Sequence, residues 1–192
     1  MKTSYVSDKN KKIIHTEDSF WKNSLARFNS AGLNYESYNP QKALSYYALS
    51  IYVKKLLPLK ASIAEFGCGS GLLLCYLYKE GFNVYGYDRS SYAIKYAKVL
   101  QENKNIKYPL KKLDIFKLKT HRLYDAVISS GMIEHFNKDI QVKLVKMMKQ
   151  VSRSYIFILY PNVGSSIYKR FLKKQKILYP LEETIDAMKI RF

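Results

Sequence analysis

The chain has few cysteines, few arginines and no long apolar run, and each shortage excludes a class of protein. Its two cysteines, Cys68 and Cys75, form no C-x-x-C pair, so we expect neither a disulfide framework nor a zinc site. The first ten residues are polar, and no stretch approaches the roughly 18 apolar residues of a membrane helix. We therefore expect no signal peptide and no membrane span, and predict a cytoplasmic, reduced protein.

The basic charge is large, but arginine contributes little of it. The formal net charge is +18, from 33 lysines and arginines against 15 acidic residues. Only six of the basic residues are arginine, the side chain that binds phosphate with two parallel hydrogen bonds. The charge is therefore either a solvated lysine surface, which we favour, or a basic face for nucleic acid.

What the chain does contain is an apolar core and a glycine-rich stretch. With 47% hydrophobic content in 192 residues, it is expected to fold as one globular domain. Ile63, Ala64 and Phe66 form a short apolar run typical of a buried parallel strand, and glycines follow at alternate positions, Gly67, Gly69 and Gly71. The apolar block after them stops at Gly81, a typical helix end. Strand, loop and helix in this order bring backbone N–H groups and a helix N-terminus close to a ligand.

An acidic residue, Glu65, precedes the first glycine by two positions. A carboxylate there would repel a phosphate, whereas it suits a cationic or amine-bearing ligand. A glycine loop alone is a weak signal, because dinucleotide-binding folds carry G-x-G-x-x-G at the same point. The stretch Glu-Phe-Gly-Cys-Gly-Ser-Gly resembles the first motif of class I S-adenosylmethionine-dependent methyltransferases. A nucleotide-binding Rossmann domain and a tight turn without a ligand are the alternatives.

A second strand is expected over residues 82–88, and its last residue, Asp88, is acidic. A carboxylate at the tip of this strand can accept hydrogen bonds from both hydroxyls of a ribose that lies over the glycine loop. A helix cap and a surface acid are the alternatives for Asp88. Ser90 or Ser91 is expected to cap the helix that follows.

A second block of the sequence runs from Tyr124 to Phe136 and reads Tyr-Asp-Ala-Val-Ile-Ser-Ser-Gly-Met-Ile-Glu-His-Phe. It predicts a buried strand over Ala126–Ile128, then small residues, then a Glu-His pair. The block resembles the fourth-strand motif of the same methyltransferase family, and a NAD-binding fold does not require it at this distance. The two blocks together favour the methyltransferase interpretation.

The resemblance implies an α/β fold, a Rossmann-like doubly wound and mostly parallel sheet with strand order 3-2-1-4-5, over roughly residues 40 to 190. A weaker strand at 106–110 contains Pro109, which demands an edge position, as the family's third strand has. The fifth strand is expected at 155–160. The sequence after it offers no candidate for the family's C-terminal antiparallel hairpin. We therefore expect either that the chain is a fragment or a diverged copy, or that the open edge of the fifth strand meets a partner or a second copy.

Two parts are expected along the chain: an N-terminal lid or cover over residues 1–39, and the methyltransferase domain over 40–192. The first carries a short amphipathic helix over 19–29, which either lids the cofactor or merely covers the sheet. Pro40 opens a helix that ends at Pro58. Its expected buried stripe is Leu44, Tyr47, Ala48 and Ile51. Further helices are expected over 137–151, 165–176 and 180–189.

The resemblance implies S-adenosyl-L-methionine as the cofactor. The residues that it assigns to cofactor binding are Glu65, Gly67, Cys68, Gly69, Gly71, Asp88, Arg89, Asp114, Ile115 and Ser130. Within this set Asp114 would bind the adenine amino group while Ile115 packs on the ring; a turn cap is the alternative for Asp114. No metal is expected, because Glu134 has no apparent acidic partner.

His135 is the candidate catalytic residue, since it follows the fourth strand where the methyl group should point. As a general base it would suit a phenol, enol or amine, and an orienting or capping role is the alternative. Ser129–Met132 lack the Asn/Asp-Pro-Pro-Tyr/Phe loop of enzymes that methylate nucleic-acid bases. We therefore predict transfer to O, N or C of a small molecule. An RNA methyltransferase that grips phosphates with Lys169–Lys176, and a catalytically silent binding module, are the alternatives.

Overall fold

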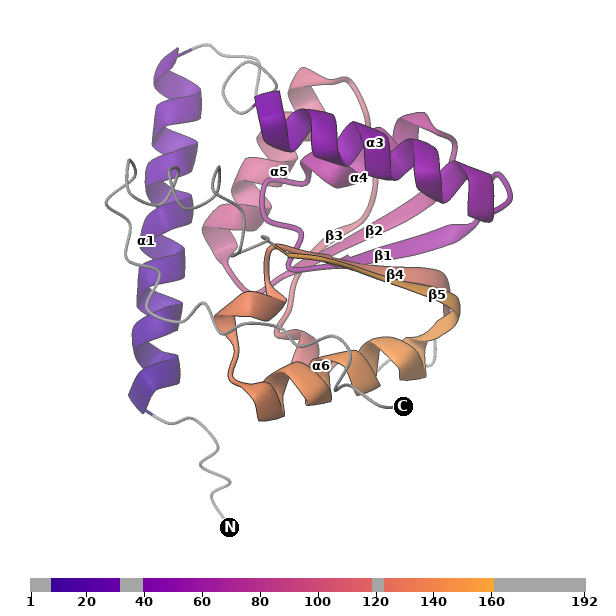
Figure 1. The fold of residues 1–192 in the computed structure, drawn as a ribbon. Coiled ribbons are helices and arrows are strands. Elements are labelled where there is room, and N and C mark those ends of the chain that lie inside the picture. The colour runs from indigo at the N-terminus through magenta and orange to yellow at the C-terminus, as the bar shows by residue number, and fades with distance from the viewer. Residues whose placement is uncertain (1–7, 32–39, 119–122, 161–192) are drawn as a thin grey trace.

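The structure, a computed structural model, describes residues 8–31, 40–118 and 123–160 (Figure 1). Five strands of the described part form one parallel sheet in the order β3-β2-β1-β4-β5, which confirms the predicted order. The strands are β1 Ser62–Phe66, β2 Asn83–Asp88, β3 Leu110–Lys112, β4 Tyr124–Ser130 and β5 Ser152–Leu159.

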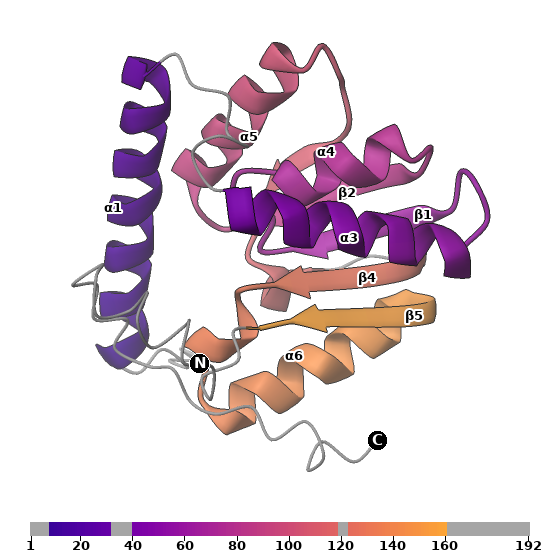
Figure 2. The same cartoon turned by 45° about the horizontal axis from the view of Figure 1, so that its top comes forward.

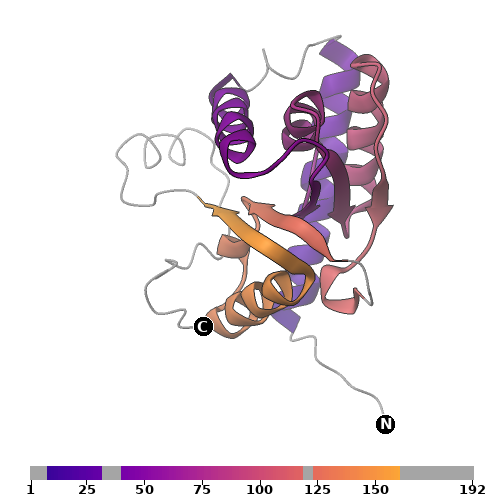
Figure 3. The ribbon, with the colours of Figure 1, turned by 90° about the vertical axis from the view of Figure 1, so that its right-hand side faces the viewer.

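Helices cover both faces of the sheet, as Figure 3 shows. On one face lie α3 (Pro40–Leu56), α4 (Leu72–Lys79) and α5 (Ser91–Asn103), and on the other lies α6 (Lys138–Val151). Two short 3₁₀ turns, η1 (Ile115–Lys117) and η2 (Ile133–His135), follow β3 and β4. Alternate residues of β1 point into the two layers, Ile63 toward α4 and α5 and Phe66 toward α6.

The carboxyl ends of the strands meet at one edge of the sheet, because all the pairings are parallel. The glycine loop, the end of β2 and the end of β4 therefore come together there. Figure 2 shows the arrowheads of β4 and β5 pointing toward α1 (Asp8–Ala31), which stands across this edge. None of the helices in the described part is long and apolar enough to cross a membrane.

The first helix is longer than predicted. A helix over 19–29 was expected from four apolar residues, whereas α1 spans Asp8–Ala31. The segment before Ser19 is polar, so it carries no periodic apolar signal. Extending a helix that has already nucleated adds one hydrogen bond per residue, and polar residues can continue it without packing.

The predicted buried stripe of α3 is wrong at three of its four positions, and the fourth, Ile51, is half-buried. Leu44 is 68% exposed, and Tyr47 and Ala48 are also exposed. The residues that α3 buries instead are Ala43, Tyr46, Ser50 and Val53. Because this helix is apolar on nearly every side, the periodicity of its sequence could not determine which face packs against the sheet.

The third strand is at the predicted edge of the sheet but starts later than predicted. Pro109 precedes β3, and its carbonyl accepts a 2.9 Å hydrogen bond from the Gly86 N–H. Tyr108 turns into the core, where its hydroxyl donates to the Gly71 carbonyl at 3.0 Å. The predicted helices over 165–176 and 180–189, the Lys169–Lys176 cluster and the question of a hairpin after β5 lie outside the described residues.

Candidate functional site

The glycine loop joins β1 to α4 at the carboxyl edge of the sheet. Gly67, Gly69 and Gly71 all have positive φ, of 73°, 52° and 74°. Residues that carry a side chain rarely adopt such φ angles, so the backbone of this turn requires glycine. Gly71 is also close-packed, since a Cβ added there would lie 3.0 Å from the Ala97 side chain.

Four N–H groups of this loop, those of Gly67, Cys68, Gly69 and Gly71, are bonded within the protein. Gly67 and Cys68 donate to the Tyr87 carbonyl at 2.8 and 3.0 Å, and Gly69 donates to a carboxylate oxygen of Asp88 at 2.9 Å. The expectation that these particular N–H groups face a ligand is therefore wrong. A pyrophosphate site needs such donors free, so their internal bonds disfavour the dinucleotide alternative.

Asp88 ends β2 and is only 3% exposed. Its carboxylate accepts from the N–H groups of Gly69 and Ser90, at 2.9 and 2.8 Å. The burial contradicts a surface acid, and the cap of α5 is Ser90, whose hydroxyl accepts from the Ala93 N–H. A contact of this carboxylate with the hydroxyls of a ligand stays a prediction.

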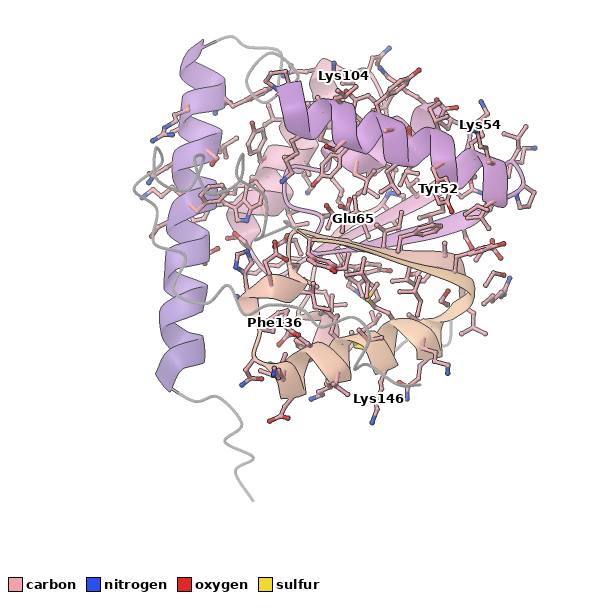
Figure 4. All side chains as sticks on the ribbon, in the orientation of Figure 1. Tyr52, Lys54, Glu65, Lys104, Phe136 and Lys146 are labelled. Atoms are coloured by element: carbon pink, nitrogen blue, oxygen red, sulfur yellow. The ribbon has the colours of Figure 1, made fainter. Side chains whose placement is uncertain are left out.

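Glu65 lies near the end of β1, beneath α3, and is 2% exposed (Figure 4). Its Oε2 atom has no hydrogen-bond partner among the described residues. Burial raises the pKa of this carboxyl well above its usual value; the Lys42 charge opposes the rise and the Asp88 charge adds to it. A buried carboxylate that lacks one bond is a ready acceptor for an ammonium group.

The raised pKa of Glu65 predicts that Glu65→Gln becomes increasingly stabilising, relative to the unchanged chain, as pH rises. The folded state holds the proton more tightly than the unfolded state, so stability is full below the unfolded pKa of about 4.5 and is lost above it. Urea unfolding of both proteins without ligand between pH 5 and 8 measures the difference in free energy of unfolding. A difference that stays constant with pH would contradict this account.

A second cluster of polar side chains joins α3 to the end of β4. The Ser130 hydroxyl donates to the Tyr46 hydroxyl at 3.1 Å, and the Lys42 Nζ lies 5.4 Å from the centre of the Tyr46 ring. Lys42 also acts on Glu65 electrostatically. Ser130 was predicted at this site, whereas Lys42 and Tyr46 were missed. Their only sequence signal was the Asn39-Pro40 helix start, which places Lys42 in the first turn of α3.

Two further side chains contact the glycines. Trp21 belongs to the helix that was expected as a lid or cover, whereas a contact of Met132 with the loop was not predicted. A Cβ added at Gly67 would lie 2.6 Å from the Met132 sulfur. One added at Gly69 would lie 2.5 Å from the Cη2 atom of the Trp21 indole. Met132 and Trp21 therefore lie against the main chain of the loop, and both glycines are needed for these approaches.

The remaining predicted residues are placed as follows. Arg89 is half-buried between Asp88 and the start of α5, and His135 is half-buried at the end of η2. Asp114 caps η1 by accepting from the Phe116 N–H at 3.1 Å, which is the role given as its alternative. Ile115 is buried in the core cluster on the α6 side. Contacts of these residues with a cofactor stay predictions.

Both thiols are buried and poorly ionised. Burial raises the pKa of Cys75 to about 11, despite a 3.3 Å contact with the Tyr108 hydroxyl, and raises the pKa of Cys68 as well. Because the thiolate is the reactive form, we expect a thiol reagent at pH 8 to label neither cysteine until the chain unfolds. Labelling of two thiols in urea, and of none in buffer, checks this; fast labelling of the folded protein would contradict it.

The donor set fits an adenosine-bearing cation that also carries an amino acid group. Asp88 offers acceptors for the ribose hydroxyls, while Glu65 and Lys42 offer opposite charges for an ammonium and a carboxylate. Within the described ranges, no group of three or more His, Cys, Asp and Glu side chains could hold a metal ion.

The chain is similar to known methyltransferases. Residues 63–154 match the family described as methyltransferase domain. The ubiquinone biosynthesis O-methyltransferase of Rickettsia akari (strain Hartford) is 30% identical over 100 residues, 52% of this chain and 39% of that protein. The protein of the same name from Rickettsia felis (strain ATCC VR-1525 / URRWXCal2) is 34% identical over 146 residues, 65% of this chain and 60% of that one. The chain thus matches less than two thirds of the length of these relatives.

Among solved structures, the plantazolicin methyltransferase BpumL in complex with a triazolic desmethylPZN analog and SAH superposes with a TM-score of 0.60 at 22% identity. The match covers 84% of this chain and 62% of BpumL. At this identity the likeness shows a shared fold, in agreement with the strand order.

Proposed function

The chain carries a class I S-adenosylmethionine-dependent methyltransferase domain, and we propose that it is an enzyme that transfers a methyl group to a hydroxyl of a small molecule. The observation that carries the proposal is the pair of buried acids at the carboxyl edge of the sheet, Glu65 and Asp88. They lie beside a glycine loop in which the three glycine N–H groups and the Cys68 N–H are bonded within the protein. This environment suits a cationic adenosine compound and is unfavourable to a phosphate.

The roles of the residues follow from their charges and positions. Asp88 would accept hydrogen bonds from the ribose hydroxyls, and Lys42 and Glu65 would hold the carboxylate and ammonium of the methionine part. Bound S-adenosylmethionine would supply a methyl group whose carbon–sulfur bond breaks as the acceptor oxygen attacks from the opposite side. His135 would take the proton of the acceptor hydroxyl as the oxygen–carbon bond forms.

A hydroxyl acceptor is supported by the relatives. They are named O-methyltransferases of ubiquinone biosynthesis, so the methylated atom in those proteins is an oxygen. A hydroxyl loses its proton during such a transfer, and His135 is the side chain of the second sequence block that can accept a proton near neutral pH.

Calorimetry with S-adenosylhomocysteine, followed by an assay with labelled methyl donor, tests the proposal. We expect saturable binding of one ligand per chain, and label transfer to at least one member of a panel of catechols, phenols and enols. The panel includes thiols, amines and total RNA as controls for the acceptor class. Absence of binding at millimolar ligand would contradict the proposal, and label found only in RNA or in amines would contradict the hydroxyl acceptor.

A further inference from the structure

Tyr46 lies between helix α3 and the end of strand β4 and contacts residues of both. It is only 6% exposed and belongs to the core layer that α3 covers. Side chains alternate along a strand, so Ser130 points into the same layer as Ile128, two residues before it. There the Ser130 hydroxyl donates to the Tyr46 hydroxyl at 3.1 Å. This bond joins the helix to the carboxyl edge of the sheet.

The ring of Tyr46 makes a second contact, with Lys42 one turn earlier on the same helix. Residues four positions apart are neighbours on one face of a helix, and the Lys42 Nζ lies over the Tyr46 ring, 5.4 Å from its centre. At this distance the face of the ring attracts the ammonium group. A lysine side chain has a long flexible stem, so the contact restricts where its charge is held.

The charge of Lys42 acts on the buried acid of the site. Glu65 is the register partner of Ile128 on β4, so its side chain points into the same layer as Tyr46. The Lys42 charge opposes the rise in the pKa of Glu65 that burial causes. The proposed function assigns the carboxylate and the ammonium of the methionine part to Lys42 and Glu65. Tyr46 therefore contacts one of the two charged side chains that would hold this part of the cofactor.

We propose that Tyr46 is a positioning residue of the cofactor site, whose ring holds the Lys42 ammonium where it binds the carboxylate of the methionine part. The inference rests on the proposed function and adds a residue that acts through Lys42. The hydroxyl bond to Ser130 fixes the ring against β4. Because the ribose is assigned to Asp88, loss of the ring weakens the hold on the amino acid end of the ligand and leaves the adenosine end unchanged.

The test compares two ligands that share the adenosine and the sulfur atom. S-adenosylhomocysteine carries the amino acid group, and 5′-methylthioadenosine lacks it. In calorimetry on the full chain, Tyr46→Leu is expected to weaken binding of S-adenosylhomocysteine about five- to 30-fold, and that of 5′-methylthioadenosine by less than about twofold. A merely structural role would not change the ratio of the two affinities.

Two further variants test whether the ring acts through Lys42. Tyr46→Phe keeps the ring, so its affinity for S-adenosylhomocysteine is expected to stay within about threefold of that of the unchanged chain. Lys42→Met removes the charge that the ring holds. In that background, Tyr46→Leu is expected to cause no further loss, because the two residues act as one unit.

Tyr124→Leu is the matched control, because Tyr124 is also a buried tyrosine whose hydroxyl hydrogen-bonds to another hydroxyl, that of Tyr87. Tyr124 belongs to the core cluster on the α6 side of the sheet, so its loss is expected to change both affinities by the same factor. Circular dichroism shows whether each variant is folded. Tyr46→Met, which also removes the ring and the hydroxyl, replaces Tyr46→Leu if the leucine variant does not fold.

Equal weakening of both ligands in Tyr46→Leu, or an undiminished loss in the Lys42→Met background, would overturn the inference and leave the proposed function intact. Equal affinities of the unchanged chain for the two ligands would overturn it as well, because Lys42 would then not hold the amino acid group. Failure of the unchanged chain to bind S-adenosylhomocysteine at all would overturn the proposed function instead.

Discussion

Replacing Asp88 with asparagine is expected to lower the affinity for S-adenosylhomocysteine by about 100-fold. Each hydrogen bond to a charged acceptor contributes about 1.5–3 kcal/mol. In the variant, the amide oxygen of asparagine still accepts from one ribose hydroxyl, but without a charge. Its NH2 group is a donor and cannot accept from the second hydroxyl. A loss of about 1.4 kcal/mol per bond is tenfold in affinity. Calorimetric titration of Asp88→Asn against the unchanged chain measures the ratio directly.

The control for this prediction is Asp125→Asn at the opposite edge of the sheet. Asp125 also accepts two hydrogen bonds, from the Ser62 N–H at 2.7 Å and the Ser62 hydroxyl at 2.8 Å, and these bonds lower the pKa of its carboxyl. Both substitutions are expected to destabilise the fold, because Asp88 holds the Gly69 and Ser90 N–H groups. Only the change at Asp88 is expected to weaken binding; equal losses of affinity would mean that Asp88 acts through stability alone.

The strand order was predicted from the resemblance to the methyltransferase family, whereas the place of the site was predictable because the sequence carries its signals where the strands end. The apolar run that ends at the Gly67 turn, the acid that closes β2 and the small residues after Ile128 each mark a carboxyl end. In a parallel sheet these ends share one edge, so three local patterns determine a common site. The placement of Pro109 beside the edge strand followed from its missing N–H in the same way.

The buried face of α3 and the missed site residues could not be predicted for a common reason. Packing between segments that are distant in the sequence overrides the local sequence pattern. α3 presents apolar residues on nearly every side, so only its contact with the sheet decides that Tyr46 is buried and Leu44 is exposed. Lys42 and Trp21 belong to helices that precede the glycine loop in the chain, and no spacing rule links them to it. Their places in the site come from how these helices dock.

Replacing His135 with asparagine is expected to lower kcat for methyl transfer to a hydroxyl by about 10²- to 10⁴-fold, the usual contribution of a general base. The affinity for S-adenosylhomocysteine is expected to stay within about threefold, because the residues assigned to the cofactor are unchanged. His135 ends η2, and its backbone N–H donates to the Met132 carbonyl at 3.1 Å, a bond that the substitution leaves in place. Initial rates with the acceptor found in the labelled-donor assay provide the measurement.

The pH dependence of the loss in rate distinguishes a histidine that acts as a general base from one that only orients the turn. Without a general base, the hydroxyl must ionise by itself, so the deficit of His135→Asn should shrink as pH rises toward the pKa of the acceptor. A histidine that only orients the turn would give a deficit independent of pH. The control is Glu134→Gln, which removes the neighbouring buried carboxyl from the same turn. If that variant gave the same loss with the same pH dependence, the electrostatics of the turn, rather than proton removal by His135, would explain both.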